Sequence, residues 1–382
     1  MTNEEFNGYK HFPICDHHLH LLYDVPLERS IMTFENIIRY FGYERITLQA
    51  LTNSTKVDDP SDNAKAFYFK DRINSDGTGR VAVFANLYHY YDGRDTAEGY
   101  LRQAEQFWAI GCDGFKNLDG KPSRRKKLNR RLDDPIFDPF YSFLEEKDLP
   151  MTMHLGDPPS FWDINKISAY ALKVGWYCDE TFPRLEEMRA EVEGILQKHP
   201  KLRLTLAHFF FLADDLEECV RLYETYPNLS FDLTPGGEMF KNFQNRLPEW
   251  RAFFKKYSTR IYLGTDTYNS YYSEKPEDYE ANVGQRLNLV RRMLETDAAF
   301  EDRNYGLLQP LTLDDDVLRN IYHDNYVRLV GEPRPVRAAL AAAYAAGLLT
   351  SFEHGHVSTG DPERDGREME GLRILYRYFM GK

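Results

Sequence analysis

The stretch KHPKLRLTLAH, residues 198–208, contains the pattern that decides the fold. It joins the end of a helical segment, a turn containing Pro200 and a short apolar run. The stretch TYPNLSFDL, residues 225–233, has the same form one helical segment later. Apolar runs that alternate with helical patterns in this way predict βαβ units, in which neighbouring strands are parallel.

The same alternation extends outward over most of the chain. Helical patterns such as 96–111 and 184–199 separate the apolar runs. Eight such units within about 250 residues predict an α/β fold of the (β/α)₈ or TIM-barrel type. A doubly wound open sheet is the competing arrangement, although no GxGxxG motif follows the first run. The expected strands are 12–21, 45–53, 80–90, 111–117, 149–156, 202–211, 229–235 and 260–266.

Two domains are expected from the order of these segments. Residues 1–331 should form the barrel, and residues 332–382 should form a C-terminal helical extension packed on it. Helical patterns over 336–349 and 367–379 support the extension.

The composition excludes several classes of protein. The 382 residues are 42% hydrophobic, which is enough for a large core, and the net charge of −12 argues against nucleic-acid or anionic-membrane partners. No apolar run approaches the roughly 18–20 residues that span a bilayer. The four cysteines are widely spaced, and the first residues show no apolar leader. We therefore expect a cytoplasmic protein in a reducing compartment.

The first apolar run, ICDHHLHL at residues 14–21, is unusually rich in histidine. Side chains two residues apart share a face of a strand, so His18 and His20 should lie on the same side as Asp16, and His17 should point away. Two neighbouring imidazoles are half of a metal site.

Three later strands end in residues of the same chemical kind. His154 ends one apolar run, His208 lies near the end of another, and Asp266 follows the last. The carboxyl ends of barrel strands form the active-site face. Burying these polar groups is costly without a partner, and a divalent cation would satisfy all of them.

With these residues in place, the sequence resembles the amidohydrolase superfamily. Within it, the chain is similar to the amidohydrolase-related group that includes aminocarboxymuconate semialdehyde decarboxylase. The matching motifs occur in family order from residue 12 to residue 331. They are DHHLH at 16–20, GFK at 114–116, MHLG at 153–156, LAH at 206–208, LGTD at 263–266 and NYVRLVG at 325–331.

The resemblance implies a role for each matching position. His18, His20, His154 and Asp266 are the expected metal ligands, and Asp266, His208 and Lys116 are the expected catalytic residues. Lys116 is ambiguous: a carbamylated lysine would bridge two metals, whereas an unmodified one could bind a substrate carboxylate. We expect one divalent metal, with a second if Lys116 is carbamylated.

Zinc suits nitrogen and oxygen ligands of this kind, and manganese, iron and cobalt are left open. We expect a hydrolase that uses a metal-activated water on a C–N or C–O bond of a small molecule. The alternative enzyme is a non-oxidative decarboxylase of an unsaturated or aromatic acid. A non-catalytic binding barrel would hold no metal.

Two further segments bear on the partner. The basic run 121–134 and the aromatic-rich insertion 156–183 follow the fourth and fifth strands, on the catalytic side. A solvated or oligomer-contact surface is the more ordinary explanation of the basic run, and a steering patch for an anionic substrate is the alternative. The aromatic residues of the insertion fit a ring-containing substrate and simple packing equally well. A homo-oligomer is left open.

Overall fold

A parallel sheet forms the centre of the molecule. The computed structural model describes all residues except 1–10, 23–24, 54–57, 270–272 and 274. In the described residues the sheet has nine strands in the order β8-β7-β6-β5-β4-β3-β2-β1-β9, and every pairing is parallel. The strands are β1 (Ile14–His20), β2 (Tyr43–Gln49), β3 (Val81–Asn86), β4 (Gly114–Gly120), β5 (Met151–Leu155), β6 (Leu204–Leu206), β7 (Leu229–Asp232), β8 (Ile261–Tyr262) and β9 (Thr267–Tyr268).

The segment 261–268 closes the sheet on itself. Its first part, β8, pairs with β7, and its second part, β9, pairs with β1. Between them, the Leu263 carbonyl accepts a hydrogen bond from His17 N, and Asp266 N donates to the His18 carbonyl. The eighth strand expected from the sequence is therefore a broken strand that joins both ends of the sheet. This closure confirms the predicted barrel over the open sheet.

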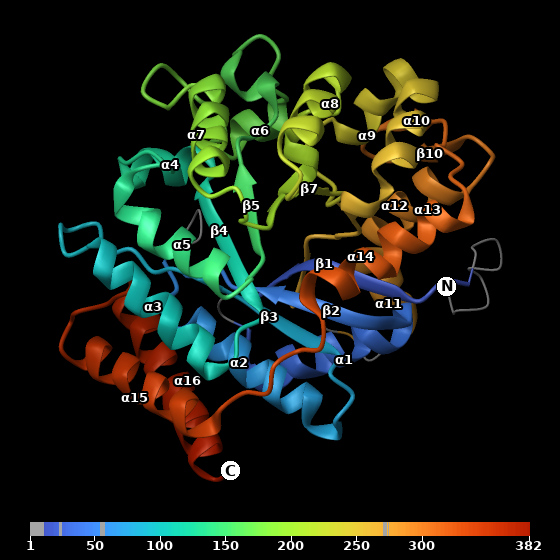
Figure 1. The fold of residues 1–382 in the computed structure, drawn as a ribbon. Coiled ribbons are helices and arrows are strands. Elements are labelled where there is room, and N and C mark those ends of the chain that lie inside the picture. The colour runs from blue at the N-terminus through green and yellow to red at the C-terminus, as the bar shows by residue number, and fades with distance from the viewer. Residues whose placement is uncertain (1–10, 23–24, 54–57, 270–272, 274) are drawn as a thin grey trace.

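Helices surround the strands, as Figure 1 shows. Helix α1 illustrates why they form: Phe34, Ile37, Ile38 and Phe41 are buried on one face, and Gly42 ends the helix in the left-handed conformation. The helices are α1 (Leu27–Phe41), α2 (Asp62–Ile73), α3 (Ala97–Ile110), α4 (Pro122–Leu128), α5 (Asp138–Glu146), α6 (Ala169–Lys173), α7 (Leu185–Lys198), α8 (Leu216–Thr225), α9 (Met239–Asn242), α10 (Leu247–Tyr257), α11 (Pro276–Tyr279), α12 (Gln285–Glu295), α13 (Asp315–Arg319), α14 (Asn325–Val330), α15 (Ala338–Glu353) and α16 (Pro362–Met380). A small hairpin pairs β10 (Phe300–Asp302) with β11 (Gly306–Leu308).

The last two helices pack against each other and against α2 on the outside of the barrel (Figure 1). This confirms the extra C-terminal helices. A buried ionic contact attaches them: Lys65 Nζ of α2 lies 2.7 Å from Glu368 of α16 and 3.0 Å from Asp59.

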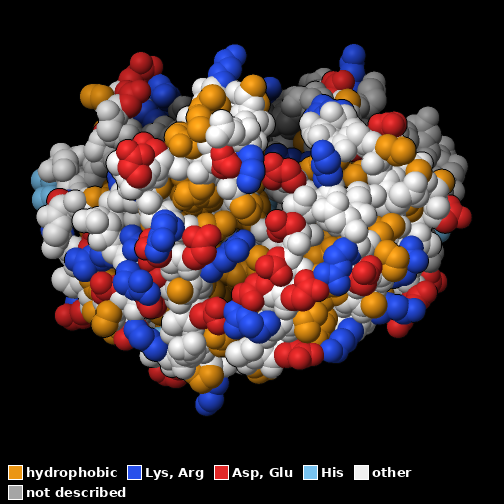
Figure 2. All heavy atoms as spheres, turned by 90° about the horizontal axis from the view of Figure 1, so that it is seen from above, with side chains coloured by type: hydrophobic (Ala, Val, Ile, Leu, Met, Phe, Trp, Pro, Cys, Tyr) orange, Lys and Arg blue, Asp and Glu red, His pale blue; other side chains and the backbone are white. Residues whose placement is uncertain are grey.

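Charged side chains of both signs cover the surface. Figure 2 shows acidic and basic side chains interspersed over one whole face, with hydrophobic side chains between them. Within the basic run, Arg125 pairs with Glu191 and Lys127 pairs with Asp58. No helix in the described part of the chain is long and apolar enough to cross a bilayer.

Candidate metal centre

Three predicted ligands meet at the carboxyl ends of β1 and β8. His18, His20 and Asp266 each offer one ligand atom, and these atoms lie within 4.8 Å of one another. Nε2 of His18 is 2.9 Å from Nε2 of His20, which is 3.4 Å from Oδ1 of Asp266. Both histidines are buried, and Asp266 is partly exposed. We name these three residues the ligand cluster.

Hydrogen bonds fix which nitrogen of each histidine carries its proton. Nδ1 of His18 lies 2.8 Å from a carboxylate oxygen of Asp232, and Nδ1 of His20 lies 2.7 Å from the carbonyl of Gln49. A carbonyl and a carboxylate can only accept, so both Nδ1 atoms must donate. The two Nε2 atoms of the neutral rings then face each other with lone pairs, at 2.9 Å. A cation between them would satisfy both lone pairs. Metal-bound histidines commonly donate their other ring N–H to a carboxylate or carbonyl, as these two do.

His154 and His208 form a second pair of the same kind. Nε2 of His154 donates to the Gly156 carbonyl at 2.9 Å, and Nδ1 of His208 donates to the Thr234 carbonyl at 3.1 Å. The remaining nitrogens, His154 Nδ1 and His208 Nε2, face each other at 3.1 Å. The rings of His208 and His18 are 5.7 Å apart, so this pair adjoins the ligand cluster.

The backbone that presents His208 departs from the expected strand. The apolar run 202–211 predicts a strand throughout, but β6 ends at Leu206. Residues 208–211 then form a left-handed turn with φ between 48° and 56°. Four consecutive non-glycine residues in this region are costly, and such strain concentrates at functional sites. The turn places His208 towards His154 while Phe209 packs into the core.

Asp232 accepts hydrogen bonds from residues of both histidine pairs. One carboxylate oxygen accepts from His18 Nδ1, and the other accepts the backbone N–H groups of His208 and Thr234. Asp232 therefore fixes one histidine of each pair. The available sequence signal was an acidic residue at the end of the buried run LSFD.

Strict strand alternation gave the wrong orientation for two residues of ICDHHLHL. His17 points into the barrel and hydrogen bonds Thr152 of β5 at 2.7 Å. Asp16 does not join the ligand cluster but accepts from the hydroxyl and backbone N–H of Thr265. The cause is a register irregularity between Asp16 and Leu19, which breaks the period of two.

Lys116 on β4, which the resemblance implies as a catalytic residue, lies beside the ligand cluster. Its Nζ is 3.1 Å from His18 Nε2, and the residue is 2% exposed. Burial lowers the pKa of Lys116 to about 8. Among the described residues, no carboxylate lies within ion-pair distance of its ammonium.

Arg286 of α12 was not found from the sequence. Nη1 of Arg286 lies 2.9 Å from Oδ2 of Asp266 and also donates to the Thr265 and Asp266 carbonyls. Burial raises the pKa of Asp266, but Arg286 and the neighbouring histidines outweigh this and hold the pKa well below its ordinary value. Asp266 is therefore a carboxylate at neutral pH.

Burial also keeps the imidazoles neutral. It lowers the pKa of His20 and of His208 to about 4, and it moves the pKa of His18 and of His154 below the ordinary value. Neutral imidazole is the form that binds a metal. The donor set of neutral nitrogens and one carboxylate thus fits a divalent cation of the zinc or manganese kind.

Loops after β5 and β7 border the centre. A cavity of about 200 Å³ lies between the Pro235–Gly237 segment, Arg286 and Tyr305. From the insertion 156–183, Ser160 donates a hydrogen bond to Glu238 at 3.1 Å. Phe161 and Ile167 pack in a small cluster of the insertion's own, so this segment carries its own apolar core.

Comparison with known proteins gives a family match and a likeness in fold. A family model described as amidohydrolase matches residues 15–331. No curated protein sequence matches the chain significantly.

Among solved structures, an uncharacterised TIM-barrel protein from Bordetella bronchiseptica is similar with a TM-score of 0.50, at 15% identity over 84% of this chain and 99% of that one. A 2,6-dihydroxybenzoate decarboxylase from Rhizobium has a TM-score of 0.47, at 14% identity over 84% of this chain and 99% of that one. A dihydroxybenzoic acid decarboxylase from Polaromonas, with bound manganese and an inhibitor, has a TM-score of 0.45, at 12% identity over 84% of this chain and 97% of that one. The likeness to the Bordetella protein shows the fold.

Proposed function

Because the chain belongs to the amidohydrolase family, we propose that it is a metal-dependent enzyme that removes CO₂, without oxidation, from an aromatic or unsaturated carboxylic acid. The observation that carries this proposal is the buried ammonium of Lys116. It lies 3.1 Å from a ligand of the cluster and has no carboxylate partner among the described residues. A buried charge without a partner is costly, so the arrangement favours an anionic group of the substrate beside Lys116.

Aromatic side chains around the centre suit a planar substrate. Phe211 stacks on His208 with ring centroids 5.3 Å apart, and Tyr268 lies 5.6 Å from His20. These rings give the polar centre an apolar border. An acid with a ring or a conjugated chain could place its carboxylate near Lys116 and its carbon skeleton against these rings.

In this proposal His18, His20 and Asp266 hold the metal, with His154 and His208 beside it. A divalent metal, when bound, supplies positive charge that stabilises negative charge developing on the substrate. Lys116 pairs with the substrate carboxylate and orients it. A proton first adds to the substrate carbon that carries the carboxylate. The carbon–carbon bond to the carboxylate then breaks, its electron pair returns to the conjugated system, and CO₂ leaves.

A group of the protein must deliver this proton to the substrate carbon. Asp266 is ionised and lies at the ligand cluster, so it can take a proton from water or from a substrate hydroxyl and pass it to that carbon. Arg286 holds Asp266 through its guanidinium and limits the orientations of the carboxylate. Asp266 and Lys116 are thus the catalytic residues of the proposal, and His208 is a positioning residue or further ligand.

One observation favours the hydrolase as a second candidate. The facing nitrogens of His154 and His208, at 3.1 Å, could hold a second metal. Lys116 would then need to be carbamylated to bridge the two ions. This reading predicts hydrolysis of neutral amides or lactones, two metals per chain and activity that depends on bicarbonate.

The deciding test is CO₂ release by the metal-loaded enzyme from a panel of hydroxybenzoates, including 2,6-dihydroxybenzoate, and unsaturated acids, beside a panel of amides and lactones. We expect CO₂ release and no hydrolysis. Lys116→Met should reduce kcat/KM at least tenfold, mainly through KM, because a charged contact of more than about 1.4 kcal/mol is lost. Lys116→Arg, which keeps the charge, should retain more activity than Lys116→Met. Hydrolysis without CO₂ release would overturn the proposal in favour of the hydrolase.

A further inference from the structure

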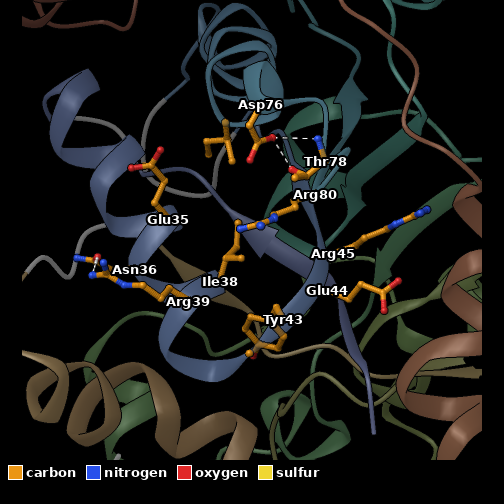
Figure 3. A pocket seen from close by; sticks show the side chains of 12 residues that line it. Glu35, Asn36, Ile38, Arg39, Tyr43, Glu44, Arg45, Asp76, Thr78 and Arg80 are labelled. Carbon is orange, nitrogen blue, oxygen red and sulfur yellow. Dashed lines mark hydrogen bonds between the residues drawn. The ribbon is translucent and has the colours of Figure 1, made fainter. Parts of the chain in front are cut away.

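The end of the barrel opposite the ligand cluster carries its own group of ligand-type side chains. A cavity of about 740 Å³ lies there, between α1, the start of β2 and the segment 73–80 (Figure 3). Glu44 and Arg45 lie next to each other at its edge. The strands begin at this end, so nothing here belongs to the candidate metal centre described above.

Three side chains from distant segments meet near the edge of this cavity, and Glu44 is one of them. Cys15 comes from the start of β1, Glu44 from the start of β2, and His323 from the helical turn Asn320–Asp324. Their ligand atoms lie within 4.8 Å of one another. Cys15 is buried, His323 is partly exposed and Glu44 is exposed, so an ion could enter from solvent.

The backbone is irregular where two of these residues lie. β1 pairs with β2 through Ile14 opposite Tyr43 and Cys15 opposite Arg45, so Glu44 is an extra residue in a β-bulge. Asn320–Asp324 is a π-helical turn within the helical segment 315–330. Bulges and π-turns redirect side chains and are common at functional sites. Here both turn a polar side chain towards the thiol of Cys15.

Hydrogen bonding prepares His323 as a ligand. Nδ1 of His323 lies 2.7 Å from the carboxylate of Asp324, which can only accept, so Nδ1 carries the proton. Nε2 lies 3.3 Å from Oε1 of Glu44. A proton on Nε2 makes this contact an ion pair, and a metal ion in place of that proton would bind both atoms. A carboxylate behind a histidine is the usual support of a metal-bound imidazole. Two ligands at about 2.0–2.1 Å from a tetrahedral zinc are separated by about 3.3–3.4 Å, which agrees with this distance.

Cys15 would need a bound cation to ionise. Burial and the charge of Glu44 raise the pKa of its thiol, and Arg45 offsets only part of this. A divalent ion bound to the sulfur supplies the charge that deprotonates a coordinating thiol. The guanidinium of Arg45 is directed elsewhere, to the Gly331 carbonyl at 2.7 Å and to Glu332 at 2.6 Å, so it does not neutralise Glu44. One thiolate and one carboxylate balance the charge of a divalent ion.

We propose that Cys15, Glu44 and His323 bind a zinc ion, with water in the fourth position, at the end of the barrel opposite the active site. Mixed sulfur, nitrogen and oxygen donors are typical of zinc. The ion would join β1, β2 and the helical segment after β8. Along the chain, Cys15 is 29 residues from Glu44, and Glu44 is 279 residues from His323. Its role is structural, since no catalytic group lies beside it.

Cobalt(II) tests this site separately from the catalytic centre. A thiolate bound to cobalt gives an intense charge-transfer band in the near ultraviolet, which the histidine and carboxylate ligands of the catalytic centre cannot give. We titrate the full-length protein with cobalt chloride and measure this band together with the cobalt content. Cys15→Ser and His323→Gln are the test variants, and Cys219→Ser, at another fully buried thiol, is the matched control.

We expect the band in the wild type and in Cys219→Ser, its loss in Cys15→Ser, and its loss or at least tenfold weaker binding in His323→Gln. His323 is partly exposed, so His323→Gln keeps the test valid if Cys15→Ser does not fold. The two test variants should also hold one cobalt fewer per chain than the wild type. Absence of the band in the wild type, or a band that persists at full strength in a folded Cys15→Ser or His323→Gln variant, would overturn the proposal. If the wild type gives no band, the contact between His323 and Glu44 is an ion pair without a metal.

Discussion

His20 shows how a hydrogen bond on one side of an imidazole sets the chemistry on the other side. The Gln49 carbonyl accepts a hydrogen bond from Nδ1–H of His20, so the Nε2 lone pair is directed at His18 and Asp266. In the same way, Asp232 accepts from Nδ1–H of His18 and leaves the lone pair of this residue on Nε2. Nζ of Lys116 lies 3.1 Å from His18 Nε2 and can donate to that lone pair. The His20 lone pair still faces His18 Nε2 at 2.9 Å and Oδ1 of Asp266 at 3.4 Å. The metal proposal therefore follows from fixed proton positions as well as from residue types.

Substitution of single ligands should separate metal binding from proton transfer. We expect His20→Ala to lose both metal and activity, because it removes a ligand from a pre-arranged pair. Asp266→Asn should keep part of the metal, since an amide oxygen can still bind it, but should lose at least 100-fold in rate because it cannot carry a proton. Metal analysis and steady-state rates measure both effects. The exposed His354→Ala is the control, and full activity in both cluster variants would contradict the assignment.

The sequence located the cluster but missed two of its supporting residues. Each of the five histidine and aspartate residues lies in, or shortly after, an apolar run, and this position is visible in the sequence: His18 and His20 in β1, His154 in β5, His208 after β6 and Asp266 after β8. Arg286 lies inside helix α12, where basic residues are common, and only the closed barrel brings it to Asp266. Asp232 has the sequence context of an ordinary acidic residue at the end of a strand. Its partners His208 and His18 are 24 and 214 residues away along the chain, so no local pattern indicates its role.

At the scale of elements, the eight strand–helix units were predictable, because buried parallel strands give continuous apolar runs. Their exact ends were not. β6 has three residues, and the next residues adopt a left-handed turn that no propensity favours. β8 is similarly interrupted, since residues 263–266 must cross from β7 to β1. Both departures occur where a polar side chain of the metal centre is presented.

The loop after β7 should be sensitive to a single methyl group. A Cβ atom at Gly236 would lie 2.7 Å from Nδ1 of His208, so Gly236→Ala must displace the ring or the loop. We expect at least a tenfold loss of activity with little change in the folded structure. Gly347→Ala in α15 is the control: its added methyl group meets nothing within 4 Å, and it should raise the free energy of unfolding by about 0.5–1 kcal/mol. Unchanged activity in Gly236→Ala would show that the position of His208 does not matter.

At the scale of the whole molecule, a buried ionic network ties the C-terminal helices to the barrel. Lys65 contacts both Asp59 and Glu368, and Ser61 hydrogen bonds the same glutamate. Asp62 lies beside this network and accepts a hydrogen bond from Leu51 N at 2.6 Å. The sequence predicted helices in this region, but nothing in it indicated which acidic residues they would meet.

This network should make stability depend on pH. Burial, together with the charge of Asp59, raises the pKa of Asp62 from 3.8 to about 8. Between these values the folded protein holds a proton that the unfolded chain has released, so the free energy of unfolding should fall as pH rises from about 4 to about 8. Each unit of difference between the pKa of Asp62 in the folded and in the unfolded protein changes the free energy of unfolding by about 1.4 kcal/mol.

Asp62→Asn should flatten this dependence, because an amide keeps an acceptor for Leu51 N but cannot ionise. The variant should therefore be more stable than the wild type at pH 8. Urea unfolding at several pH values, followed by circular dichroism, measures the difference. An identical slope in the two proteins would show that Asp62 does not control it.

The central claim is that the ligand cluster holds the catalytic metal, and anomalous diffraction from crystals of the metal-loaded enzyme tests it most directly. Data on both sides of the metal's absorption edge should show a peak at the carboxyl ends of β1 and β8, bonded to Nε2 of His18, Nε2 of His20 and a carboxylate oxygen of Asp266. Density at Lys116 should show an unmodified ammonium group. A fully loaded enzyme with no peak at these three residues, or a carbamate at Lys116 bridging two peaks, would contradict the account.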